Sequence, residues 1–112
     1  MSLSLTLIFE CPGRPPSTVY AQNKLSFGDV SGNVHVSLLE VSVPLPEGVE
    51  YPDDQEGLQL RHSDAYGDPL TFVSAALLVP RLQGVARGPW QPGIVAFLEK
   101  LPPSTRVVLW WH

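Results

Sequence analysis

Prolines and glycines divide the chain into short hydrophobic runs, and this division constrains the fold more than any other feature. The sequence holds twelve prolines and nine glycines in 112 residues. Most of them lie between apolar runs, where they mark turns rather than low-complexity sequence. Each run is far shorter than the roughly 20 residues that a membrane span needs. We therefore expect a soluble single domain, residues 1–112, with one hydrophobic core and no membrane partner.

The clearest predicted strands lie near the two ends. The first follows a period of two, the pattern of a half-buried strand, through Leu3, Leu5, Leu7 and Phe9. The last, Arg106–Trp111, is almost continuously hydrophobic and is predicted to be a central strand covered on both faces. Because Trp110 and Trp111 are adjacent, they must point to opposite faces, one into a helix-covered core. Trp90 is expected in a surface turn between prolines.

Two further strands are predicted in the first half, about Lys24–Gly28 and Val34–Val43. Asp29–Asn33 supplies turn residues between them, so the pair is predicted to form a hairpin. The hydrophobic phase of the second run changes between Leu38 and Leu39, which we interpret as a β-bulge. Residues 44–68 show little periodicity and predict a long loop. Leu58 and Leu60 alternate weakly within this loop and predict a short edge strand.

Two helices are predicted after the loop. Asp68 and Pro69 have the residue types of an N-cap and a first helical position, so one helix is expected from there to Gln83. Pro80 should kink or end it. Its predicted buried side comprises Leu70, Val73, Leu77 and Val79. The other helix begins at Pro92 and ends before Pro102 and Pro103, with apolar residues at Ile94, Val95, Phe97, Leu98 and Leu101.

These elements predict an α+β domain. The expected order is strand, strand, strand, long loop, helix, helix, strand. The two helices would cover one face of a mainly antiparallel sheet of about four to five strands.

Charge is concentrated in one part of the chain. Glu47–Asp68 holds seven of the eleven acids and one base, Arg61, which gives a formal charge of 1 − 7 = −6, whereas the rest sums to +2. Such a segment either solvates a long loop or presents a surface to a basic partner. The net charge of −4 and pI near 5.1 oppose nucleic-acid binding, which depends on Lys and Arg. The single cysteine, Cys11, excludes an internal disulfide and is compatible with the cytoplasm.

The sequence contains no catalytic, metal or cofactor motif. His62 and Asp64 lie close to other acids, but they lack the frame of a calcium loop or a histidine pair at helical spacing. Cys11 is followed six residues later by Ser17, where a phosphatase-type loop requires arginine. The serines have no Gly-x-Ser-x-Gly context, although a triad assembled from distant residues is defined by geometry and stays open. We therefore predict no enzyme, no metal and no cofactor.

Our leading hypothesis is a non-catalytic protein-binding module whose acidic loop engages a basic partner protein. An inhibitor or immunity protein that neutralises a toxin or enzyme would have this character. Complementary charge speeds encounter, and buried aromatics supply affinity. The predicted contact residues are Glu47, Glu50, Tyr51, Asp53, Asp54, Glu56, Asp64 and Tyr66.

Two alternatives stay open. The first is a small-molecule-binding or enzymatic domain with a pocket between the sheet and the long loop, lined by Trp110 or Trp111 with His62 and Asp64. The second is a structural subunit that covers an apolar sheet face by self-association, as in a homodimer.

Overall fold

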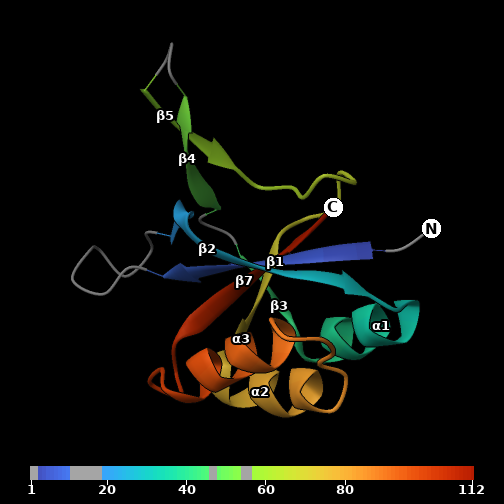
Figure 1. Ribbon diagram of the computed structural model, residues 1–112. Helices are drawn as coiled ribbons and strands as arrows, with labels where there is room; N and C mark the ends of the chain where they lie inside the picture. Colours follow the sequence, from blue (N-terminus) through green and yellow to red (C-terminus); the bar gives the residue numbers. More distant parts are fainter. Residues whose placement is uncertain (1–2, 11–18, 46–47, 54–56) are drawn as a thin grey trace.

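A computed structural model describes residues 3–10, 19–45, 48–53 and 57–112. Within these ranges the chain is an α+β domain with the element order β-β-α-β-β-β-β-α-α-β. The predicted fold class is confirmed, and the mainly antiparallel sheet has helices on one side (Figure 1). The described residues contain three helices where the sequence predicts two. In this part of the chain no helix has the length and hydropathy needed to cross a bilayer.

The sheet is built around the two terminal strands. β1 (Leu3–Glu10) lies between β2 (Val19–Val30) and β7 (Arg106–Trp111) and pairs antiparallel with both. Both terminal predictions are confirmed, and the predicted strand Lys24–Gly28 lies inside the longer β2. β6 (Thr71–Ser74) pairs with the other side of β7, and β3 (Val43–Pro44) pairs with β6.

A hairpin extends the sheet beyond β2. It consists of β4 (Val49–Asp53) and β5 (Gly57–Arg61), so the strand order is β3-β6-β7-β1-β2-β4-β5. The hairpin joins β2 through one parallel residue pair, Tyr20 with Glu50. The edge strand predicted at Leu58 and Leu60 is confirmed as part of β5, whereas β4 and the Pro44 end of β3 fall in the range predicted as a loop, residues 44–68.

The segment predicted as the strand Val34–Val43 is a helix, α1 (Gly32–Val41), and the predicted hairpin does not form. The apparent phase change has a helical cause, because Val34 and Leu38 are one turn apart and both are buried. The Ser31 side chain accepts a hydrogen bond from the Val34 amide and caps the helix. The valines favour a strand locally, but packing of one helix face onto the sheet decides the outcome.

The second helix begins later than predicted. Asp68 and Pro69 do not start it, because Pro69 forms an extended bridge with Ser63 and the Asp68 amide donates to the Asp64 carboxylate. β6 follows, and α2 (Ala75–Gln83) starts only after it. Pro80 lies inside α2 and does not end it. The buried side is therefore Ala75, Leu78 and Leu82, whereas Leu77, which was expected inside, is exposed.

The third helix, α3 (Gln91–Glu99), agrees with the prediction to within one residue at its start. Val95 and Leu98 are its buried positions, and Phe97 is largely exposed with its ring edge against Phe9. The helix ends before Pro102 and Pro103, as expected.

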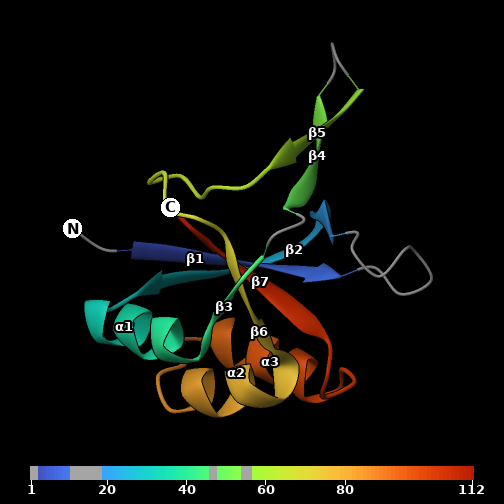
Figure 2. The ribbon, with the colours of Figure 1, turned by 180° about the vertical axis from the view of Figure 1, so that it is seen from behind.

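Two apolar clusters lie on opposite faces of the sheet. The three helices cover one face (Figures 1 and 2), and alternate residues of β1 and β7 point towards them. This main core is formed by Leu5, Leu7, Phe9, Phe27, Val34, Leu38, Val73, Ala75, Leu78, Leu82, Val95, Leu98, Val107, Leu109 and Trp111. A smaller cluster lies on the other face, where Ile8 of β1 and Val108 of β7 point. Its other members are Leu45, Val49 and Leu70, with Phe72 and Trp110 packed against them.

Candidate functional site

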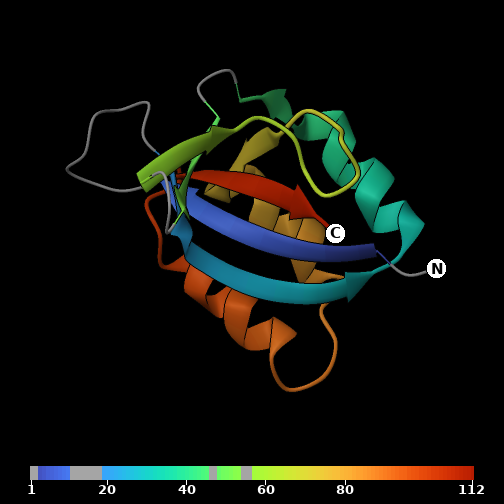
Figure 3. The same cartoon turned by 90° about the horizontal axis from the view of Figure 1, so that it is seen from above.

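The acidic segment is defined as Glu47–Asp68, and its described residues, 48–53 and 57–68, lie on the side of the sheet opposite the helices. Figures 1 and 2 show the hairpin β4–β5 projecting from the body on this side. Seen from above, the chain that follows β5 returns across the C-terminal end of β7 (Figure 3). Within the range predicted as a long loop, residues 49–53 and 57–61 are organised by strand pairing.

Apolar contacts hold the base of the acidic segment against the sheet. Leu45, Val49 and Leu70 are buried over Ile8 and Val108, the residues of β1 and β7 that face away from the helices. Backbone hydrogen bonds reinforce the contact: the Leu45 amide donates to the Leu70 carbonyl at 3.0 Å, and the Leu70 amide donates to the His62 carbonyl at 2.9 Å. The hairpin is thus anchored at its base and extends into solvent beyond it.

Gly48 lets the chain enter the hairpin. Its φ is +72°, a conformation that favours glycine. A Cβ at this position would lie 2.6 Å from the Arg61 carbonyl oxygen and 2.9 Å from the His62 ring. The close approach brings the first residues of β4 against the end of β5, so no other residue fits here without displacing the backbone.

Asp64 shapes the loop between β5 and β6. Its Oδ1 accepts hydrogen bonds from the amides of Tyr66 at 2.8 Å and Asp68 at 3.1 Å. Its own amide donates to the Asp68 carbonyl, and the Gly67 amide donates to the Asp64 carbonyl. The next amide, that of Ala65, donates to the Trp111 carbonyl at the end of β7. Asp64 is accordingly buried at 9% exposure and fixes the turn that ties the acidic segment to the sheet.

The predicted contact residues divide between two places. Glu50, Tyr51 and Asp53 lie on β4, and Asp64 and Tyr66 lie in the turn after β5. Glu50 is half-buried and Tyr66 is 48% exposed. For Tyr51 and Asp53 the structure describes the strand position alone. Glu47, Asp54 and Glu56 lie outside the described residues, as does Cys11.

The histidine and acid proposed as polar groups of a pocket each lie in a different local setting. His62 is exposed beside Gly48, and one oxygen of Asp64 is bound to the amides of its own turn. His35 lies with its ring edge against Trp111, with the ring centroids 4.5 Å apart. In the described ranges, no group of three His, Cys, Asp or Glu side chains is arranged to hold a metal ion.

The adjacent tryptophans point to opposite faces, as predicted. Trp111 is 3% exposed in the main core, and Trp110 is half-buried in the smaller cluster. Trp90 precedes α3 and is 79% exposed, in agreement with its expected surface position.

A row of polar side chains beside Trp110 was not anticipated. Thr6 Oγ1 lies 2.8 Å from His112 Nε2, and Ser4 Oγ donates to Asp29 Oδ1 at 2.7 Å. These residues come from three neighbouring strands or their ends. The available signal was the polar half of the period-two pattern in β1, where Ser4 and Thr6 alternate with Leu5 and Leu7. The pairs are exposed and link strands across the open face of the sheet.

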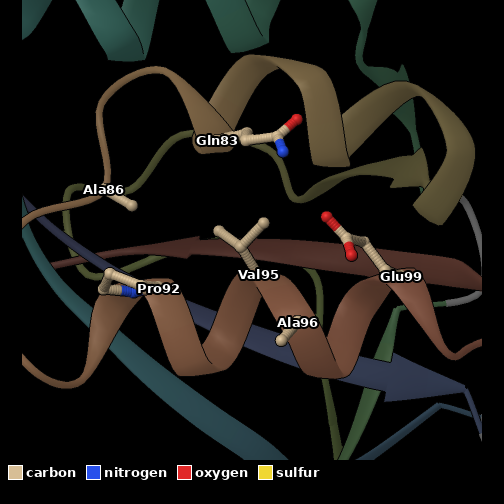
Figure 4. Close-up of a pocket in the computed structure, with 6 residues that line it drawn as sticks. All are labelled: Gln83, Ala86, Pro92, Val95, Ala96 and Glu99. Carbon is tan, nitrogen blue, oxygen red and sulfur yellow. The ribbon is translucent and has the colours of Figure 1, made fainter.

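A pocket of about 210 Å³ lies in the helix layer, on the opposite side from the acidic segment. Figure 4 shows it between α2 and α3, with Val95 and Glu99 projecting towards Gln83. A neighbouring hollow of about 250 Å³ shares Glu99 and continues along the same two helices. Both are open grooves lined mainly by alanine, valine and proline side chains.

Comparison with protein-family models, with curated protein sequences and with solved structures finds no match for this chain.

Proposed function

We propose that the protein is a non-catalytic binding module whose acidic segment engages a basic surface of another protein. An inhibitor that blocks an enzyme, such as an immunity protein that neutralises a toxin in the cytoplasm, would act in this way. The observation that carries the proposal is the position of the charge. Of the seven acids in the acidic segment, Glu50 and Asp53 lie on the projecting hairpin, and Asp64 and Asp68 lie in the anchored turn that follows it.

The electrostatics favour a partner of opposite charge. The acidic segment has a formal charge of −6, and Arg61 is its single base. A concentrated field of one sign raises the rate of encounter with an oppositely charged surface and disfavours acidic competitors. Exposed aromatic side chains supply the affinity that charge alone does not give. Tyr66, at 48% exposure beside Asp68, is suited to this role, and Tyr51 lies in β4 between Glu50 and Asp53.

Preorganisation supports the same proposal. The base of the hairpin is held by buried Leu45, Val49 and Leu70, and the following turn is held by Asp64. Binding therefore does not have to order these parts of the backbone, which lowers the entropic cost of association. In this proposal Asp64 contributes by shaping the turn that presents Tyr66, since its Oδ1 is already bound to that turn.

The proposal is tested by capture from a lysate of the native host with three immobilised proteins. The first is the wild type, and the second carries Asp53→Lys and Asp54→Lys. The third, a control, carries Glu40→Lys and Glu99→Lys, which make the same change in net charge on the exposed surface of the helices. We expect the wild type and the control to retain the same basic protein at low salt and to release it at high salt.

The Asp53 and Asp54 variant should retain much less of that protein. Equal retention by all three proteins would contradict the proposal. Equal loss by both variants would assign the effect to net charge rather than to the acidic segment.

A further inference from the structure

We propose that the outer edge of β5 pairs with an extended basic segment of the partner, which adds a strand to the sheet. This inference rests on the proposed function and names the kind of segment that the acidic hairpin receives. Peptides that add to a sheet edge gain affinity from backbone hydrogen bonds and specificity from side chains at alternate positions.

The two edges of the sheet differ in what they offer a strand. β3 ends the sheet on one side, and it consists of two residues, one of them proline. β5 ends it on the other side with five residues, Gly57-Leu58-Gln59-Leu60-Arg61, which include no proline and no acid. Natural sheets protect their edges with proline, inward charges or very short strands. β3 has two of these protections, whereas β5 carries only one charged residue, Arg61, at its end.

Pro52 shows which way the backbone amide and carbonyl groups of β5 point. β4 and β5 pair Pro52 with Leu58 and Glu50 with Leu60. Proline has no N–H, so the pair of Pro52 and Leu58 is not a hydrogen-bonded pair. Hydrogen-bonded and non-hydrogen-bonded pairs alternate along antiparallel strands, which makes the pair of Glu50 and Leu60 non-hydrogen-bonded too. The amide and carbonyl groups of Leu58 and Leu60 therefore point away from β4, towards the outer edge.

The same edge is accessible. Figures 1 and 2 show β5 on the hairpin that projects from the body, and Leu60 is 58% exposed. No described strand lies on its outer side. A partner strand would find outward backbone groups at two positions and an exposed leucine side chain at one of them.

Charge decides between the two occupants that an open edge could accept. A second copy of this chain would bring another segment of charge −6 beside the first, and such like charges repel. A segment that alternates lysine or arginine with apolar residues would instead be attracted by the net negative charge of the acidic segment and would find an apolar contact at Leu60. We therefore assign the edge to a basic partner strand.

The test uses a short peptide that alternates lysine and valine, with two control peptides. One control replaces the lysines with glutamates, and the other places proline in the centre, where it removes a backbone donor. Hydrogen exchange of the whole protein is followed by NMR at low salt. We expect the lysine peptide to slow exchange of the Leu58 and Leu60 amides and to leave the helix amides unchanged. Neither control should do so.

A matched pair of variants isolates the backbone donor. Leu60→Pro removes the N–H that points outward. Leu60, like Pro52, lies in a non-hydrogen-bonded pair of β4 and β5, so proline there leaves the hairpin hydrogen bonds intact and is tolerated on an edge strand. Leu60→Val keeps the N–H and an apolar side chain. We expect Leu60→Pro to weaken peptide binding by about threefold to tenfold, the effect of one hydrogen bond. Leu60→Val should bind like the wild type.

Several results would overturn the inference. The lysine peptide could fail to bind, or it could protect other amides. The proline and valine variants could bind equally well, or the protein alone could form dimers that protect Leu58 and Leu60. If the captured partner still discriminates against the Asp53 and Asp54 lysine variant but binds both Leu60 variants equally, the edge inference fails and the proposed function stands. If it does not discriminate against the lysine variant, the proposed function itself fails.

Discussion

The two faces of the sheet are covered in different ways, and adjacent residues of β7 show the contrast. Trp111 enters a large core beneath three helices, whereas Trp110 lies half-buried under a turn and the base of a hairpin. The helix face is sealed by regular elements with many buried leucines and valines. The other face is covered by Leu45, Val49 and Leu70, and the strands β4 and β5 project from the body on this side.

This difference should separate the residues that stabilise the domain from those that we propose contact a partner. Burial of apolar surface provides most of the free energy of folding, so the helix face should dominate the stability of the domain. The small cluster on the face opposite the helices buries fewer apolar side chains. The backbone of the acidic segment there depends on particular residues such as Gly48 and Asp64. Substitutions on the two faces should therefore have different consequences.

The largest expected loss comes from the helix face. Leu98→Ala removes a fully buried side chain of α3 and should lower the free energy of unfolding by about 2–5 kcal/mol. Leu77→Ala is the matched control, because this leucine of α2 is half-exposed, and it should cost less than about 1 kcal/mol. Urea denaturation measures both. A loss below about 1 kcal/mol for Leu98→Ala would mean that α3 is peripheral.

Gly48→Ala tests the close backbone contact at the start of the hairpin β4–β5. We expect a loss of about 2–5 kcal/mol, because a positive φ costs about 1–2 kcal/mol and a steric overlap about 1–3 kcal/mol. Gly67→Ala is the control: its φ is +84° but a Cβ there meets no atom within 4 Å, so about 1–2 kcal/mol is expected. Amide exchange in β4 and β5 should speed up in Gly48→Ala alone. Equal losses in the two variants would contradict the close contact with Arg61 and His62.

Asp64→Ala should have a smaller effect. It removes the acceptor for the amides of Tyr66 and Asp68 and should lower stability by about 1–2 kcal/mol. Asp64→Asn keeps an acceptor oxygen and should lose less than about 1 kcal/mol. Denaturation gives the stabilities, and NMR shifts of Tyr66 and Asp68 show whether the turn persists. If alanine and asparagine behave alike, the turn does not depend on these hydrogen bonds.

The sequence predicts the bounds of β1, β7 and α3 better than it predicts the structure of the acidic segment. β1 and α3 follow clean periods of two and 3.6, and β7 is recognised from its continuous hydrophobicity, so each is predicted close to its observed bounds. α1 is missed because its valines favour a strand locally and only packing onto the sheet makes them helical. β6 is missed because Asp68 and Pro69 imitate a helix start, whereas the Asp64 turn claims Asp68.

The charge of the candidate site is visible in the sequence, but its geometry is not. Pro52 and the acids of β4 oppose a strand locally, and pairing with β5 overrides them. The weak alternation of Leu58 and Leu60 does predict an edge strand, but local sequence does not show which strand β5 joins, because the hairpin attaches to the sheet through the pairing of β4 with the distant β2. The sequence therefore suggests a charged binding surface but does not show that Glu50 and Asp53 lie on a projecting hairpin.

Association kinetics of the Asp53→Lys and Asp54→Lys variant with the captured partner, measured against salt, test the central claim most directly. Unfolding of the same variant is measured in parallel. The account predicts that its free energy of unfolding stays within about 0.5 kcal/mol of the wild type. Its association rate should fall at low salt, and the salt dependence that the wild type shows should weaken. An unchanged association rate at every salt concentration would contradict the claim that the acidic segment recognises the partner.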